Sequence, residues 1–284
     1  SLSSIALETL PFVAYLFVPV RKWYFRLGLL AIVPVSLVCI IYSGSRTAYV
    51  AILAIGVMMW VLSKRKLRIL LVAAVFAPFL LAAIPDQYKE RFASITGEEK
   101  AGRSKDARIQ ILEDSWDIFL ENPLGLGVAS FVQERIRKFG RRQDTHNLYL
   151  QVLTHLGIQG GVVFLAWVVS IYYAFFQSKR KFESLRTWVV EVARSGRVVD
   201  PEEKKWLRSL YWNCELLEAL SKALVVFLAT RMVIGLFGHD LYFIFWWFAT
   251  GFAIVLPMQA ARFERRIAAY KRSREDAEPF SVPR

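Results

Sequence analysis

Long apolar segments alternate with short polar ones along most of the chain. Several come close to the roughly 20 apolar residues that a membrane-spanning helix needs, and they are 27–42, 47–63, 69–84, 147–176, 219–237 and 241–258. Segment 5–20 is a weaker candidate because Glu8 interrupts it. The period-2 alternation of barrel strands is missing from the sequence, and backbone polar groups in lipid have to be satisfied within a helix or a barrel. The pattern therefore predicts an all-α, polytopic transmembrane helical bundle.

Residues 85–145 are expected to form a large helical region rather than a simple connection. Within them, stretch 104–120 carries apolar residues three and four positions apart, which indicates an amphipathic helix. Asn122-Pro123 should end this helix, because the residue before a proline disfavours helical backbone angles. A second short helix is expected over 130–139.

The distribution of charge predicts how the segments are oriented. A net charge of +13 could indicate nucleic-acid binding. However, the basic residues gather at alternate ends of the apolar segments, in 21–26, 64–68, 179–208 and 262–274. This is the positive-inside pattern, so we expect membrane lipids and no nucleic acid as partners. The predicted division is transmembrane helices in 1–84, an outer helical loop in 85–145, further transmembrane helices in 146–258 with a cytoplasmic loop at 177–216, and a cytoplasmic basic tail in 259–284.

The start of the chain and its cysteines add less. The sequence has neither an initiator methionine nor a signal peptide, and the predicted topology puts Ser1 outside. We therefore expect the sequence to be the C-terminal part of a longer protein. Cys39 and Cys214 are predicted to lie near opposite membrane faces, too far apart to pair, and no metal-binding spacing is present.

Two arginines are candidates for binding phosphate on the outer side. Arg46 follows Ser43-Gly44-Ser45, small residues that let a ligand approach, and a guanidinium matches phosphate with a planar set of donors. The alternative for Arg46 is an anchor that reaches toward lipid headgroups. Arg108 lies early on the predicted amphipathic helix, where the alternative is a solvated surface residue.

His146 and Asn147 are expected at the outer start of segment 147–176, with His146 as its cap. Histidine changes charge near neutral pH and can accept a proton from a hydroxyl group. The alternative is an interfacial histidine that bonds to the backbone. His155 lies two turns deeper, and we interpret it as a packing residue.

A dense basic run precedes this pair and includes Arg135, Arg137, Arg141 and Arg142. Next to a membrane entry such a run can hold phosphates of a lipid headgroup, although most basic runs are solvated surfaces.

Charged residues near the end of segment 219–237 form a further candidate group. Arg231 lies at membrane depth, which marks it as functional by default, or else as a partner of Glu8. His239 and Asp240 are weaker candidates on the outer face.

Several kinds of chemistry find no motif in the sequence. It contains neither a phosphate-binding glycine loop with Lys-Ser/Thr nor HExxH, and it has no serine-based nucleophile elbow. No carboxylate cluster marks a divalent-metal site. We therefore expect no cofactor, no metal and no ATP-driven step.

An ordered set of these residues resembles the O-antigen ligase / polymerase superfamily. The set runs from Arg108 through Asn122-Pro123-Leu124-Gly125-Leu126-Gly127 and His146-Asn147-Leu148-Tyr149-Leu150-Gln151 to Leu156-Gly157-Ile158-Gln159-Gly160, with Ser43-Gly44-Ser45-Arg46 upstream. Single pieces are weak, but their order around a long outer loop is fairly specific. The resemblance covers roughly residues 40–165.

The resemblance implies a GT-C-type glycosyltransferase of the bacterial inner membrane, with its active site facing the periplasm. It implies transfer of a glycan from undecaprenyl diphosphate to lipid A–core, with inversion and without a metal. Catalysis would fall to Arg46, Arg108 and His146. An O-antigen polymerase and a protein O-oligosaccharyltransferase of the same superfamily remain alternatives. So does a transporter of anionic solutes with Arg46 and Arg231 along its pathway, although no paired repeats are visible.

Overall fold

The computed structural model describes residues 2–43, 46–63, 98–196, 198–238 and 241–277, with a few single positions between 66 and 78. In this part of the chain every regular element is a helix, so the predicted all-α fold is confirmed. Predicted segment 69–84 lies mostly outside the described residues. The helices are α1 (Leu2–Leu16), α2 (Trp23–Tyr42), α3 (Arg46–Leu62), α6 (Glu98–Glu121), α7 (Phe131–Phe139), α8 (Leu148–Arg194), α9 (Pro201–Gly235) and α10 (Ile244–Ala277).

Three of the described helices, α2, α8 and α10, are long and apolar enough to cross a membrane. Two shorter apolar helical stretches, Ser3–Leu16 and Val50–Leu62, accompany them. Many large apolar side chains of these helices are exposed to the outside of the bundle, as lipid-facing surfaces are. The protein is therefore a membrane protein.

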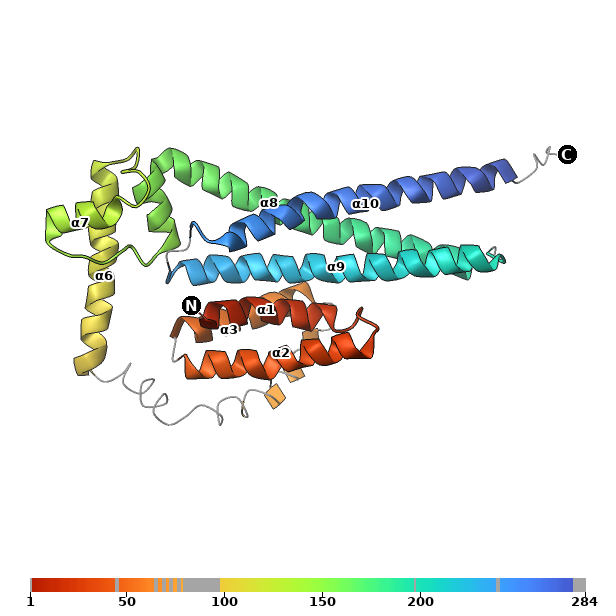
Figure 1. Cartoon of the computed structure of the whole chain (residues 1–284), viewed down its shortest axis with the longest axis horizontal. Helices are drawn as coiled ribbons and strands as arrows, with labels where there is room; N and C mark the ends of the chain where they lie inside the picture. Colours follow the sequence, from red (N-terminus) through yellow and green to blue (C-terminus); the bar gives the residue numbers. More distant parts are fainter. Residues whose placement is uncertain are drawn as a thin grey trace.

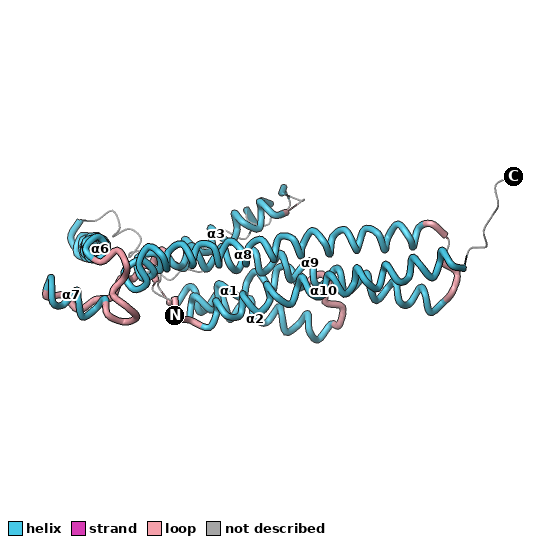
Figure 2. The backbone as a smooth tube through the Cα atoms, turned by 90° about the horizontal axis from the view of Figure 1, so that it is seen from above, coloured by secondary structure: helices cyan, strands magenta, loops and turns pink. Residues whose placement is uncertain are grey.

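Helix α9 is the centre of the bundle, and it contacts α1, α3, α8 and α10. It contributes to both apolar cores, one shared mainly with α8 and α10 and the other with α1 and α3. The predicted segment 219–237 lies in this helix, where most side chains from Ala219 to Gly235 are buried. The helices next to α9 run along the same axis in both views (Figures 1 and 2).

Segment 177–216, predicted as a cytoplasmic loop, is mostly helical. Helix α8 continues to Arg194 and α9 begins at Pro201, after the N-cap Asp200 accepts a hydrogen bond from the Glu203 amide at 3.1 Å. The 47 residues of α8 correspond to roughly 70 Å of helix, whereas the hydrocarbon core of a bilayer is about 30 Å thick. The structure shows that most of this segment is helical, and its cytoplasmic location stays a prediction.

Helices α8, α9 and α10 therefore continue beyond α1 and α2 (Figure 1). Arg21, which follows α1, contacts α9 through an ion pair with Glu215 at 3.7 Å and through the Trp212 ring, whose centroid is 4.3 Å away. This contact marks where the α1–α2 pair ends along α9. We call residues 181–194, 201–211 and 264–277 the three-helix extension.

At the opposite end of the bundle, α6 runs across the helix axes rather than along them (Figures 1 and 2). The prediction of an amphipathic helix here is correct, and α6 ends at Glu121 as the following Asn122-Pro123 predicted. Helix α7 agrees with the predicted 130–139 helix. It ends at Gly140, whose left-handed φ of 68° allows its amide to bond to the Ile136 carbonyl.

A break in α8 receives the loop that follows α6. Gly157 has φ 70° and ψ −171° inside the helix, so the amides and carbonyls around it are released from the helical pattern. The Leu126 and Gly127 amides donate to the Thr154 and His155 carbonyls, each at 2.9 Å. The Ile158 amide donates to the Pro123 carbonyl at 2.9 Å. These main-chain bonds fix the first turns of α8 against the loop.

Glycine is required at both surfaces of this contact. A Cβ on Gly157 would lie 2.3 Å from the Leu124 carbonyl carbon, and a Cβ on Gly125 would lie 2.6 Å from the Gly157 nitrogen. Both residues also have positive φ, which other residues rarely adopt. The loop and the helix can meet only because neither has a side chain at the point of contact.

Candidate functional site

A cavity of about 140 Å³ lies at the end of the bundle where α6 crosses it. Arg108 and His146 both line it, although they are far apart in the sequence. The rest of its wall is mainly apolar and comprises Ile111, Leu112, Thr145, Leu236 and Phe237. We call this the Arg108–His146 cavity. It combines a permanent cation, a group that can accept a proton, and an apolar surface.

Arg108 reaches the cavity because of its position on α6. Buried Ile111 and Ile118 pack that helix onto the rest of the protein, and Arg108 and Leu112 lie beside this buried face, one helical turn apart. The Arg108 side chain is exposed. The exposed guanidinium is accessible to an anion, and its planar set of donors matches phosphate.

His146 is held by unusual local backbone geometry. Its φ is 45°, a left-handed value that is uncommon for a residue with a side chain. The Thr145 amide donates to Asp144 Oδ1 at 2.7 Å, and the Thr145 hydroxyl donates to the Asn147 carbonyl at 3.2 Å. These bonds fix the backbone on both sides of His146 and direct the residue to the cavity.

Asn147, rather than His146, caps α8. Its Oδ1 accepts hydrogen bonds from the Tyr149 and Leu150 amides at 2.9 and 3.1 Å, as an N-cap residue does. The prediction that His146 caps this helix was therefore wrong. The side-chain oxygen of Asn147 can accept bonds from the free amides at the start of the helix, and His146 lines the cavity instead.

The start of α8 also holds the end of α9. Asn147 Nδ2 donates to the Leu236 carbonyl at 3.2 Å, and the Tyr149 hydroxyl donates to the Met232 carbonyl at 2.8 Å. The last carbonyls of a helix lack partners within it, so these bonds stabilise the α9 terminus. They also set the position of Leu236 and Phe237 in the cavity wall.

The predicted basic run divides into separate environments. Arg135 is buried, donates through Nε to Asp114 Oδ2 at 2.9 Å and also bonds to the Gln143 carbonyl at 3.1 Å. Arg141 donates to both Asp114 oxygens at 2.9 and 3.0 Å. We call Asp114, Arg135 and Arg141 the Asp114 cluster. It fastens α7 and the following loop to α6, on a different side of α6 from Arg108.

The other two arginines of the run lie on the surface. Arg137 forms two hydrogen bonds to Glu134, at 2.8 and 2.5 Å. The hydrogen bond from Arg137 lowers the pKa of the Glu134 carboxyl, which keeps the pair ionised. Arg142 is exposed. Neither residue lines the Arg108–His146 cavity.

The remaining predicted site residues lie in different parts of the protein. Arg46 is the first residue of α3, and α3 begins at the same end of the bundle as α9 ends (Figure 1); its side chain lies outside the described atoms. His239 and Asp240 lie outside the described residues. Arg231 is buried and bonds to Glu8 at 2.5 Å, with its guanidinium 4.4 Å from the Phe245 ring centroid. It therefore joins α1, α9 and α10.

Sequence reasoning missed two features of this end of the protein. Leu236 and Phe237 are apolar residues at the end of an apolar helix, and no local signal distinguishes them as cavity wall. Tyr242 lies with its hydroxyl 3.1 Å from Nδ1 of buried His155. His155 was predicted to pack, and it is buried, but it also holds this phenol.

Metal ligands are not clustered in the part of the chain that the structure describes. No group of three or more histidine, cysteine, aspartate or glutamate side chains there could hold a metal ion. The polar chemistry of the cavity thus comes from Arg108, His146 and the hydroxyl of Thr145.

Comparison with known protein families shows which family the sequence matches. A family model described as O-antigen ligase matches residues 12–165, which is more than half of the 284 residues. The match includes α6, α7, the glycine contact and the three polar residues of the cavity, Arg108, Thr145 and His146. Searches of curated proteins and of solved structures give no match.

Proposed function

Because the chain belongs to the O-antigen ligase family, we propose that it transfers a glycan from undecaprenyl diphosphate to lipid A–core. The family implies lipid-linked glycan substrates in general; the particular donor and acceptor are our proposal. We further propose a GT-C-type arrangement in the bacterial inner membrane, with the Arg108–His146 cavity facing the periplasm. The positive-inside distribution of the basic segments supports this orientation.

The reaction is a displacement at the anomeric carbon of the donor sugar. The acceptor hydroxyl oxygen forms a bond to this carbon while the bond to the diphosphate oxygen breaks, so the configuration inverts. His146 takes the hydroxyl proton. The leaving undecaprenyl diphosphate keeps the bonding electron pair, and Arg108 together with Arg46 stabilises the negative charge that develops on it. No metal or nucleotide takes part.

The observation that carries this proposal is the shared cavity. Arg108 and His146 come from segments separated by α7 and the glycine loop, yet they line one space. An anion-binding group and a proton acceptor are the two functions that the displacement requires. The apolar wall formed by Leu112, Leu236 and Phe237 suits a polyprenyl carrier that approaches from the membrane.

The acceptor is proposed to dock beside the cavity through its phosphates. Arg142 is the best candidate of the basic run, because it is exposed while Arg135 and Arg141 are bonded to Asp114. A basic side chain near a membrane surface contributes about 1 kcal/mol to binding an anionic headgroup. Arg142 would therefore affect acceptor affinity more than the chemical step.

The test is transfer by the purified intact protein with an undecaprenyl-diphosphate-linked glycan as donor. Lipid A–core, an undecaprenyl-linked glycan and a pilin-type protein are offered separately as acceptors. We expect product with lipid A–core, and a loss of about 100-fold or more in Arg108→Ala and in His146→Ala. Asp117→Ala, an exposed change elsewhere on α6, should transfer normally.

Each other result has a definite meaning. Product only with the undecaprenyl-linked glycan would identify a polymerase, and product only with the pilin-type protein would identify a protein oligosaccharyltransferase. Unchanged transfer by both alanine variants would refute the roles of Arg108 and His146. Anion uptake in proteoliposomes, without glycan transfer to any acceptor, would show that the protein is a transporter rather than an enzyme.

A further inference from the structure

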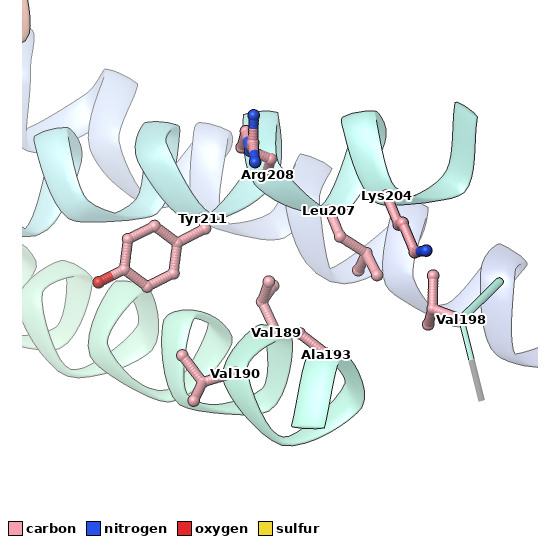
Figure 3. Close-up of a pocket in the computed structure, with 8 residues that line it drawn as sticks. All are labelled: Val189, Val190, Ala193, Val198, Lys204, Leu207, Arg208 and Tyr211. Carbon is pink, nitrogen blue, oxygen red and sulfur yellow. The ribbon is translucent and has the colours of Figure 1, made fainter. Parts of the chain in front are cut away.

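The three-helix extension lies at the end of the bundle opposite α6 (Figure 1). It contains an open groove between α8 and α9 (Figure 3). Its volume is about 250 Å³. Helix α8 lines it with Val189, Val190 and Ala193, and helix α9 with Lys204, Leu207, Arg208 and Tyr211. Val198, in the turn between the helices, closes one end. We call this the α8–α9 groove.

The opposite side of the same helix pair is already filled by α10. The Tyr270 ring stacks on Trp206, with ring centroids 5.1 Å apart, and Trp188 lies 5.9 Å from the Tyr270 ring. Arg274 of α10 bonds to both carboxylate oxygens of Glu203, at 2.5 and 2.7 Å. Helices α8 and α9 thus bind α10 through an apolar surface with a charged contact beside it. The α8–α9 groove presents a similar surface with no described helix on it.

The charge in the groove has one sign and a regular spacing. Lys204 and Arg208 are four residues apart, so they lie one helical turn apart on the same face of α9. Both are exposed, and neither forms an ion pair with a described residue. Among the described residues that line the groove, none is acidic. An occupant that carries acidic groups about one turn apart would therefore match it.

By the predicted topology, in which 177–216 is cytoplasmic, the groove lies outside the lipid. Val189 follows Gly157 by 32 residues, which is about 48 Å along a helix, compared with about 30 Å for the hydrocarbon core. A lipid chain anchored in the bilayer is therefore a poor occupant. A second copy that docked through the same surface would bring two further cations to it, and like charges disfavour that contact.

We propose that the α8–α9 groove binds an amphipathic helix of a cytoplasmic protein, with apolar residues facing Val190 and Ala193 and acidic residues facing Lys204 and Arg208. Helices commonly dock in this way, with apolar anchors at helical spacing. The inference depends on the packing of the extension and on its cytoplasmic side, and not on glycan transfer.

The experiment is site-specific photo-crosslinking of the intact protein in its native membrane. A photoreactive phenylalanine replaces Ala193, which is exposed and lines the groove. The matched reporter replaces Ser184, which is also exposed on α8 but does not line the groove. We expect the Ala193 reporter to form an adduct with a soluble protein. Mass spectrometry should locate the adduct in an amphipathic helix with acidic residues three or four positions apart.

Charge reversal completes the test. The double variant Lys204→Glu and Arg208→Glu should lower the adduct yield at least about tenfold, because acidic groups would then repel the partner. Lys205→Glu with Arg272→Glu makes the same change in net charge at exposed residues outside the groove and should leave the yield unchanged. Each of three results would overturn the proposal: no adduct, an adduct only with lipid or a second copy, or an adduct insensitive to the groove reversal.

Discussion

Two sides of α6 use arginine for different purposes. In the Asp114 cluster, Arg135 is 1% exposed and its guanidinium bonds to a carboxylate and a carbonyl. At the Arg108–His146 cavity, Arg108 is exposed beside an imidazole and an apolar wall. The first guanidinium has used its hydrogen-bonding capacity within the protein, whereas the second is accessible to a ligand. A dense basic run in a sequence therefore need not mark the binding site.

The largest expected effect breaks the Asp114 cluster. Arg135→Ala removes the buried partner of Asp114 and leaves the carboxylate only Arg141, so we expect a loss of about 3 kcal/mol of folding free energy, the lower end of the cost of breaking a buried ion pair. Thermal unfolding of the detergent-solubilised protein should show a clearly lower midpoint. Arg137→Ala on the same helix is the control, because its ion pair is exposed and should not affect the midpoint. An unfolding midpoint equal to that of the wild type would show that Arg135 does not stabilise the fold through Asp114, and that it does not differ in this respect from Arg108.

The second effect sharpens the role of Arg108. Arg108→Lys keeps the positive charge but loses the planar set of donors that matches phosphate. If the guanidinium binds the diphosphate, transfer should fall about tenfold, equivalent to about 1.4 kcal/mol, with no change in the unfolding midpoint. Steady-state transfer rates measure this. Wild-type activity would mean that charge alone suffices.

A smaller effect is expected at the junction between α8 and α9. Asn147→Ala removes the α8 cap and the donor to the Leu236 carbonyl, and a lost cap costs about 1 kcal/mol. The unfolding midpoint should fall modestly. Asn147→Asp retains an oxygen that can cap the helix but not the donor to Leu236, so it separates the two contributions. If Asn147→Asp is as unstable as Asn147→Ala, the contact with Leu236 dominates.

The smallest effect concerns acceptor docking. Arg142→Ala should raise the KM for lipid A–core about fivefold, equivalent to about 1 kcal/mol, and leave kcat and the unfolding midpoint unchanged. Initial rates at varied acceptor concentration give both constants. A lower kcat with an unchanged KM would argue against a docking role.

The sequence predicted the helical elements better than the environments of their side chains. Apolar periodicity and Asn122-Pro123 were enough to find α6 and its end, because both signals are local. The pairing of Arg135 with Asp114 was not predicted, since it joins residues 21 positions apart whose approach depends on how α7 folds back. The resemblance identified Arg108 and His146, but their common cavity depends on the end of α9.

The extension shows the same limit at a larger scale. The charged residues between 177 and 216 predicted where the apolar segments stop, but not that α8 and α9 continue as helices through most of that stretch. The helices continue because their polar stretches still have buried positions such as Phe182, Val189, Leu207 and Leu210. These residues recur at helical spacing and could have been recognised from the sequence.

The glycine contact between the loop and the broken part of α8 has a practical consequence for redesign. Its principal bonds join main-chain atoms, so the side chains of Leu124 and Leu126 can be exchanged without removing any of them. New side chains could therefore be introduced on the loop between α6 and α7 while its backbone keeps its shape. At this contact Gly125 and Gly157 should not be replaced, because a larger residue at either position would push the loop away from α8.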